Sequence, residues 1–202
     1  SRDPRMPGII FEQVTDPKSA TKNRVHLDLA SVDRADQRNT VEALMEMGAT
    51  PAAVGQTDQP WVVLADPEGN EFCVLEPRPR YENGATLASI VLNAVDPQSL
   101  AEFWVEATGW SVRDQAEDWV SLSAPDGQPP DLDLVRVPEA KQVKNRVHLD
   151  VETIAGGDRD LEVARLVALG ATPADVGQAA DASWVVLADP EGNEFCVLKA
   201  PQ

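Results

Sequence analysis

The sequence has few of the features that mark secreted, membrane-spanning or nucleotide-binding proteins. Two cysteines in 202 residues cannot build the disulfide framework of a small secreted domain, and such sparing use fits a reducing cytoplasm. The longest apolar runs, such as Trp61–Ala65, are far shorter than a membrane span requires. No basic segment followed by an apolar stretch is visible as a signal peptide, so we expect cytoplasmic localisation. The sequence also has no GxGxxG loop, no Walker loop and no recognisable Ser/Cys–His nucleophile motif.

Basic residues are scarce relative to acidic ones. Lys and Arg number 17 against 34 Asp and Glu, which gives a net charge of −17 and a pI of about 4.3. This charge repels phosphate backbones and anionic lipid, so we expect neither nucleic acid nor membrane as a partner. Most of the acidity is explained by solubility. Hydrophobic residues make up 43% of the chain, which is enough for a folded core.

A long internal repeat organises the sequence. Three segments recur about 120 residues further along the chain, and the last of them returns without a single change. The repeated pairs are Lys22–Leu29 with Lys144–Val151, Gly48–Gln56 with Gly170–Gln178, and Trp61–Leu75 with Trp184–Leu198. A period of this length indicates a duplicated domain rather than a solenoid.

Each copy of the repeat predicts a strand followed by a helix. Residues 24–29 alternate between polar and apolar side chains, as in a strand with one face on a core. The polar face carries Arg24, His26 and Asp28. Apolar residues at helical spacing begin at Val41 and end at Gly48, which is typical of an amphipathic helix with a glycine after its last turn.

A β-hairpin is predicted at the end of each copy. A short strand is expected near Ala52–Val54, and two apolar runs follow, Trp61–Ala65 and Glu71–Leu75. The residues between these runs are Asp, Pro, Glu and Gly, which suit a type I turn. The two runs should therefore pair as antiparallel strands, with Phe72 in the core.

Residues 86–137 predict the same βαβββ order in a different sequence. Leu87–Ala94 is apolar and β-prone, Asp96-Pro97 suits a helix start, and Gly109 suits the helix end. Trp104 lies on the apolar stripe of this helix and is expected in the core. Three short strands are predicted next, at Trp110–Val112, Trp119–Ser123 and Asp131–Val137.

The arrangement of the modules along the sequence predicts two domains. Residues 84–200 hold two modules, 86–137 and 144–198, which would form one complete domain. Residues 1–78 hold one module and, at Gly8–Val14, the expected last strand of another. We therefore expect a truncated chain that forms homo-oligomers, because a sheet without its partner module exposes an edge. The alternative is a three-module arrangement in which the orphan module docks on a neighbour.

Paired βαβββ modules closed by a DPxG hairpin resemble the vicinal oxygen chelate superfamily. The segments HLDL, GAT and WVVLADPEGNEFCVL are most similar to its glyoxalase-like branch. The superfamily also includes bleomycin-resistance proteins. The resemblance implies an α+β fold of curved mixed sheets that form a cup. It specifies function much less, because this fold carries isomerases, dioxygenases, thiol transferases and binding proteins.

The resemblance also implies metal-ligand positions, a histidine on the first strand and a glutamate on the last strand of each module. In the C-terminal domain these positions fall on Ser89, near Val135, on His148 and on Cys196. Because most ligands are replaced, we expect no metal cofactor, with a divalent Zn, Ni, Mn or Fe ion as the alternative. The candidate ligands for that alternative are Glu12, His26, Cys73, His148 and Cys196. Both cysteines are better explained as small buried residues than as metal ligands.

The remaining polar residues of each cup are candidates for chemistry or binding. We expect His26 to meet Glu71 or Cys73 across neighbouring strands, where a histidine beside a carboxylate has a tunable pKa. The catalytic candidates are His26, His148, Glu71 and Glu194. The ligand-binding candidates are Trp61, Trp184, Trp119, Arg24, Arg146, Asp28 and Asp150. Internal ion pairs and packing between modules explain the same residues structurally.

Three functions remain open from the sequence. The first is metal-independent binding of a small, partly aromatic molecule in a cup between modules, with sequestration of a toxic compound as the family precedent. The second is a metal-dependent lyase, isomerase or dioxygenase that uses Glu12 and His26. The third is cofactor-free acid–base catalysis by His26 or His148 with Glu71 or Glu194.

Overall fold

The structure is a computed structural model that describes residues 8–14, 17–55, 58–82, 84–153, 157–179 and 181–199. It divides into two compact units, an N-terminal unit of residues 1–22 and 28–88 and a C-terminal unit of residues 23–27 and 89–202. The division therefore passes through two strands, β1 (Val25–Leu29) and β5 (Leu87–Ala94). Among the described residues, every helix is too short or too polar to cross a lipid bilayer.

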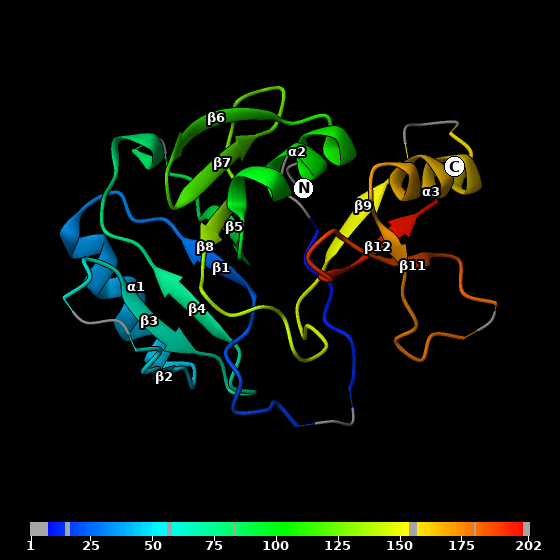
Figure 1. Cartoon of the computed structure of the whole chain (residues 1–202). Coiled ribbons are helices and arrows are strands. Elements are labelled where there is room, and N and C mark those ends of the chain that lie inside the picture. Colours follow the sequence, from blue (N-terminus) through cyan, green and yellow to red (C-terminus); the bar gives the residue numbers. More distant parts are fainter. Residues whose placement is uncertain are drawn as a thin grey trace. The chain divides into compact units, whose positions relative to one another are not determined.

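Three βαβββ modules follow one another along the chain (Figure 1). The first consists of β1, α1 (Arg34–Glu46), β2 (Thr50–Pro51), β3 (Val62–Ala65) and β4 (Glu71–Val74). The second consists of β5, α2 (Pro97–Thr108), β6 (Ser111–Ala116), β7 (Trp119–Ser123) and β8 (Asp131–Arg136), after a 3-10 turn η1 (Pro79–Tyr81). The third consists of β9 (Leu149–Glu152), α3 (Arg159–Ala168), β10 (Thr172–Pro173), β11 (Val185–Ala188) and β12 (Glu194–Leu198).

The strand order is the same in every module. It reads β2-β3-β4-β1 in the first, β6-β7-β8-β5 in the second and β10-β11-β12-β9 in the third. The first strand always runs parallel to the last one, and the hairpins are antiparallel. The predicted α+β fold of curved mixed sheets is therefore confirmed.

The two segments of identical sequence, Trp61–Leu75 and Trp184–Leu198, form hairpins with the same register. Val62 faces Val74 across the first hairpin, as Val185 faces Val197 across the second. In the first turn the Gly69 N–H donates to the Asp66 carbonyl at 2.9 Å, the closing bond of the predicted turn, and the same bond recurs in the second copy. A glycine suits this position because its φ is +86°.

The helices begin where capping residues were predicted. The carboxylate of Asp96 accepts the Ser99 N–H at the start of α2, and Pro97 occupies the first turn. Gly109 ends α2 in the left-handed conformation, with φ +71°. The predicted termini of this helix are confirmed.

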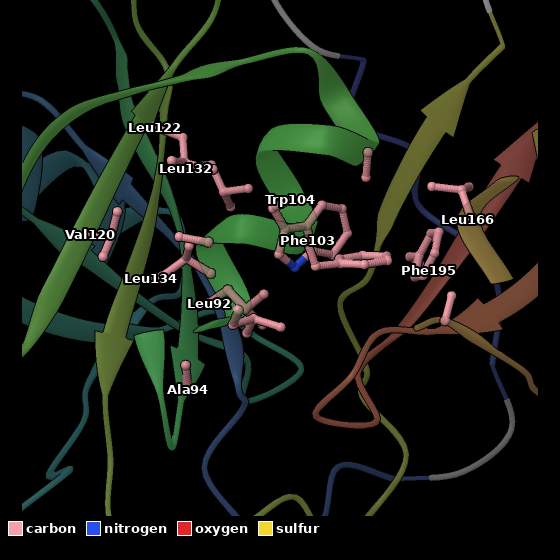
Figure 2. Packing of buried hydrophobic residues seen from close by; sticks show 14 of the residues in the cluster. Leu92, Ala94, Phe103, Trp104, Val120, Leu122, Leu132, Leu134, Leu166 and Phe195 are labelled. Atoms are coloured by element: carbon pink, nitrogen blue, oxygen red, sulfur yellow. The ribbon is translucent and has the colours of Figure 1, made fainter. Parts of the chain in front are cut away.

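The main core of the C-terminal unit lies between α2 and the sheets. Trp104 is almost completely buried and meets Phe195 edge-on, with 5.3 Å between ring centroids. Phe103 packs against both rings, and Leu166 of α3 belongs to the same cluster (Figure 2). The predicted core position of Trp104 is confirmed. Phe195 is also fully buried, whereas its repeat partner Phe72 is only partly buried at the margin of a smaller cluster.

Two expectations about secondary structure need correction. Gly8–Val14 has no regular secondary structure along its whole described length, and Phe11 within it is 91% exposed. An extended segment becomes a strand only when its backbone bonds to a neighbour, and no backbone bond to this segment is found among the described residues. The short strand expected near Ala52–Val54 lies slightly earlier, at Thr50–Pro51.

Candidate functional site

A largely buried group of polar side chains lies on one face of the sheet of the middle module, and we call it the serine–aspartate face. Ser89 pairs with Asp131 in the β5–β8 register, and Ser121 pairs with Asp133 in the β7–β8 register. Alternation along a strand places these side chains on one face of the sheet. The residues between them face the opposite way, into the core against α2: Leu122, Leu132 and Leu134. The face consists of Ser89, Ser121, Ser123, Asp131 and Asp133.

Asp131 is completely buried and well partnered. Its carboxylate accepts a hydrogen bond from the Ser123 hydroxyl and lies 3.2 Å from Nε of Arg113. A second nitrogen of Arg113 donates to the Ser121 hydroxyl at 3.0 Å. A buried carboxylate held by a guanidinium and a hydroxyl is a stable structural element, so Asp131 has little capacity left for a ligand.

Asp133 differs from Asp131 because one of its two carboxylate oxygens, Oδ1, has no well-formed hydrogen bond among the described residues. Neither Oδ1 of Asp133 nor Oγ of Ser89 makes a well-formed hydrogen bond within the described part of the chain, and both atoms are buried. Burial raises the pKa of the Asp133 carboxyl, and the nearby hydroxyls of Ser121 and Ser89 oppose that rise. A buried acceptor without a donor costs free energy, which a ligand N–H or O–H would recover.

A second cluster lies in the third module. His148 immediately precedes β9, Asp150 lies on β9, and Cys196 lies on β12 opposite Asp150 in the strand register. One donor atom from each of the three side chains lies within 4.8 Å of the other two. Nε2 of His148 is 3.3 Å from Oδ1 of Asp150. The side chains of His148 and Asp150 are 34% and 33% exposed, whereas Cys196 is buried.

The protonation of this cluster is set by its own members. The hydrogen bond to Asp150, and next the one to Cys196, raises the pKa of His148 to about 10, although burial acts in the opposite direction. An imidazolium beside a carboxylate is an ordinary consequence of charge complementarity. His148 and Asp150 therefore neutralise each other.

The first module repeats part of this arrangement. Asp28 faces Cys73 across the β1–β4 register, as Asp150 faces Cys196 in the third module. Burial, followed by the charge of Asp28, raises the pKa of the Cys73 thiol. His26 precedes Asp28 by two residues on β1 and falls within the C-terminal unit, on the other side of the division.

The predicted carboxylate partners of the histidines are bonded elsewhere. Glu71 forms an ion pair with Lys18 at 3.0 Å, and Glu194 forms one with Lys141 at 2.7 Å. Glu194 also accepts the backbone N–H of Asn145. Because the same lysine pairing occurs in both copies, these glutamates anchor the segment before the first strand to the hairpin.

Arg24 also has structural partners. Its guanidinium donates to the carbonyls of Glu139 and Asn93, both at 2.7 Å, and to the carboxylate of Glu191 at 3.2 Å. Glu191 in turn accepts the backbone N–H groups of Val95 and Asp96 at the start of α2. Arg24 thus joins β1, β5 and the second hairpin turn, and Arg146 of the second copy is partly buried.

The remaining predicted site residues are spread over the chain. Trp61 packs against a small core cluster of the N-terminal unit, Trp119 is partly buried on β7, and Trp184 is 37% exposed. Glu12 is exposed in the segment 8–14 and lies outside the groups of potential metal ligands among the described residues. A surface hollow of about 510 Å³ is lined by other residues: Val95, Asp118, Arg136, Val137 and Pro138.

Sequence reasoning missed most of the serine–aspartate face. Of its five residues only Ser89 was considered, as the replacement for a histidine ligand. The signal was nevertheless present, because Ser121–Ser123 and Asp131–Leu134 alternate strictly between polar and apolar residues. Alternation with acidic residues on the inner face of a predicted strand indicates that this face is not part of an apolar core.

Comparison with known proteins supports the fold over most of the chain. A family model for the glyoxalase-like domain matches residues 1–75 and 89–198. Among solved structures, a glyoxalase I variant from Zea mays has a TM-score of 0.58 at 16% identity, covering 86% of this chain and 66% of that one. A putative dioxygenase from Bacillus subtilis has a TM-score of 0.57 at 13% identity, covering 90% of this chain and 63% of that one. This chain thus spans less than two thirds of either protein. Curated protein sequences give no match.

The metal ligands implied by this fold do not fit the residues present. The two positions in the middle module carry Ser89, whose side chain is a buried hydroxyl, and the apolar region of Val135. The two positions in the third module carry His148 and Cys196. A site shared between these modules would have one imidazole and one thiol, too few donors for a catalytic metal centre.

Proposed function

The chain belongs to the glyoxalase-like domain family of the vicinal oxygen chelate superfamily, and on that premise we propose that it binds a small molecule without chelation by a shared metal. The ligand is held by the serine–aspartate face of the middle module. One observation supports the proposal, namely that buried Oδ1 of Asp133 and buried Oγ of Ser89 make no well-formed hydrogen bond among the described residues.

The charge of this face limits the chemistry of the ligand. Asp131 is already neutralised by Arg113, so the carboxylate of Asp133 remains as the unbalanced group. A carboxylate or phosphate would be repelled, whereas an N–H or O–H donor would satisfy both orphan acceptors. We therefore propose a ligand that presents an amine or hydroxyl group, with a protonated amine binding most strongly. Sequestration of such a compound is the biological role that fits a binding protein.

Binding is tested with matched small molecules and the full chain. Benzylamine, benzyl alcohol and benzoate differ only in the polar group, so titration calorimetry with each reports the preference of the site. We expect binding in the order amine, alcohol, benzoate, and we expect Asp133→Asn to weaken amine binding by about tenfold or more. Asp126→Asn, in an exposed turn, is the matched control and should bind like the wild type. Equal affinity for benzoate, or unchanged amine binding by Asp133→Asn, overturns the proposal.

The metal-dependent alternative through Glu12 and His26 gains no support from the arrangement of these residues. Glu12 lies in an exposed segment and is not among the grouped potential metal ligands in the described part of the chain. Cofactor-free catalysis by His148 with Glu194 is also weakened, because Glu194 is bonded to Lys141 and Asn145. Whether the protein catalyses a reaction with its ligand is a question for turnover assays on the compounds that bind.

A further inference from the structure

We propose that Arg113 determines how many positive charges a ligand of the serine–aspartate face can carry: with Arg113 present the face takes a monoamine and discriminates against a diamine. This inference rests on the proposed function, because it concerns the same face and the same class of ligand. It adds a specificity-determining residue from β6, a strand that contributes none of the five residues by which the face is defined.

A β-bulge in β6 brings Arg113 to this face. The β6–β7 register shifts between Val112 and Asp114, which pair with neighbouring residues of β7. Arg113 is therefore an extra residue between two successive pairs, and a bulge of this kind re-aims a side chain. As a result, its guanidinium donates to Oγ of Ser121 at 3.0 Å and lies 3.2 Å from Oδ2 of Asp131.

Arg113 reaches the face from an exposed strand. β6 is an outer strand of its module, and all six of its residues are exposed. The side chain of Arg113 is 34% exposed, whereas that of Asp131 is completely buried. The leucines of β7 and β8 pack on the opposite side of the sheet, so replacing Arg113 removes no atom from the apolar core. Its charge can therefore be tested separately from the packing of the module.

Two carboxylates and this guanidinium set the charge of the face. Asp131 and Asp133 are separated by one residue on β8, and side chains at this spacing on one side of a strand lie about 7 Å apart. The guanidinium of Arg113 is paired with Asp131, which leaves the carboxylate of Asp133 without a counter-ion. A ligand with one ammonium group balances this single charge.

A second ammonium group on the ligand would meet Arg113 instead of a free carboxylate. Like charges at close range repel each other, so the diamine is disfavoured as long as Arg113 is present. Without Arg113 the preference reverses, because Asp131 is then a buried carboxylate without its counter-ion, and the second ammonium group supplies one. Arg113 thus acts as a built-in counter-ion that excludes a second ligand charge.

The test compares two amines that differ only by a second aminomethyl group. Benzylamine and 1,4-bis(aminomethyl)benzene are each titrated by calorimetry into the full chain and its variants. We expect the wild type to bind benzylamine about tenfold more tightly than the diamine, and Arg113→Gln to reverse this order, because one neighbouring charge changes the affinity of a carboxylate for a cation by about tenfold or more. Arg113→Lys keeps the charge and should keep the wild-type order.

Arg38→Gln is the matched control, because Arg38 is exposed on α1 and lies outside the face. It should bind both amines like the wild type, and circular dichroism checks that Arg113→Gln folds. A second variant, Asp131→Asn, tests the same charge balance without removing the arginine. It leaves the guanidinium unbalanced near Asp133 and should weaken benzylamine binding by about tenfold, and combining it with Arg113→Gln should restore that binding.

The two proposals fail separately. If Arg113→Gln still prefers benzylamine, or if Asp131→Asn leaves benzylamine binding unchanged, the role of Arg113 is overturned while the proposed amine site stands. If the wild type binds neither amine, the proposed function is overturned and this inference with it.

Discussion

Asp133 is the residue at which the proposed binding function would act against stability. Its neighbour Asp131 is fully buried yet held by Ser123 and Arg113, whereas Oδ1 of Asp133 is buried without a donor of good geometry among the described residues. An unsatisfied acceptor lowers the free energy of unfolding, and proteins retain such groups most often at functional sites. This cost makes Asp133 testable by stability as well as by binding.

We predict that Asp133→Asn is more stable than the wild type at neutral pH. Because burial raises the pKa of Asp133, the folded state holds a proton that the unfolded state releases, so stability falls as pH rises from the unfolded value of about 3.9 through the raised folded value. Asparagine does not titrate, so Asp133→Asn should not lose this stability as the pH rises. Urea unfolding should show a gain near pH 7 that disappears near pH 3, and Asp126→Asn should show neither effect.

At the scale of elements, the two hairpins have the same sequence but pack against different neighbours. Phe195 of β12 meets the rings of Phe103 and Trp104 of α2, and is fully buried. Phe72 of β4 is only partly buried, beside Leu64 and Val74. The register and the turn are the same in both, so the sequence determines the hairpin, while the neighbouring helix determines how much each phenylalanine contributes.

We therefore predict unequal costs for two equivalent substitutions. Phe195→Ala should lower the free energy of unfolding by about 3–5 kcal/mol, the usual loss for a large aromatic removed from a core. Phe72→Ala should cost less than about 2 kcal/mol, because less apolar area is lost from burial. Urea denaturation of both variants followed by circular dichroism makes the comparison, and equal losses would show that burial does not differ between the copies.

The comparison of the two hairpins also shows which features the sequence could predict. Strands, helix termini and hairpin turns follow from alternation, capping aspartates and the Asp-Pro-Glu-Gly turn, which are local signals. The partners of His148 could not be assigned, because Glu194 and Cys196 share one strand face and both are within reach in the sequence pattern. Only the position of Lys141, which bonds Glu194, leaves Asp150 and Cys196 as the neighbours of His148.

At the scale of the whole molecule, an exposed apolar segment stands out on a strongly acidic chain. Four apolar side chains between residues 8 and 14 are more than half exposed: Ile9, Ile10, Phe11 and Val14. Contiguous exposed apolar side chains of this kind mark a contact with another molecule. Between two copies of this chain, the burial of these side chains would have to outweigh the repulsion of two net charges of −17. We propose that the partner is a second copy of the chain.

We predict that the wild type forms a homo-oligomer through residues 8–14 and that Phe11→Asp shifts it toward the monomer. Phe11 is 91% exposed, so the substitution removes no contact within its own unit and should leave the fold unchanged. An aspartate in a self-complementary interface adds like charges that repel each other. Light scattering on a sizing column measures the mass, and Met47→Asp, which is 77% exposed at the end of α1, is the control that should keep the oligomer. A monomeric wild type, or an equal effect of both substitutions, would contradict this assignment, because a specific interface must distinguish Phe11 from another exposed apolar residue.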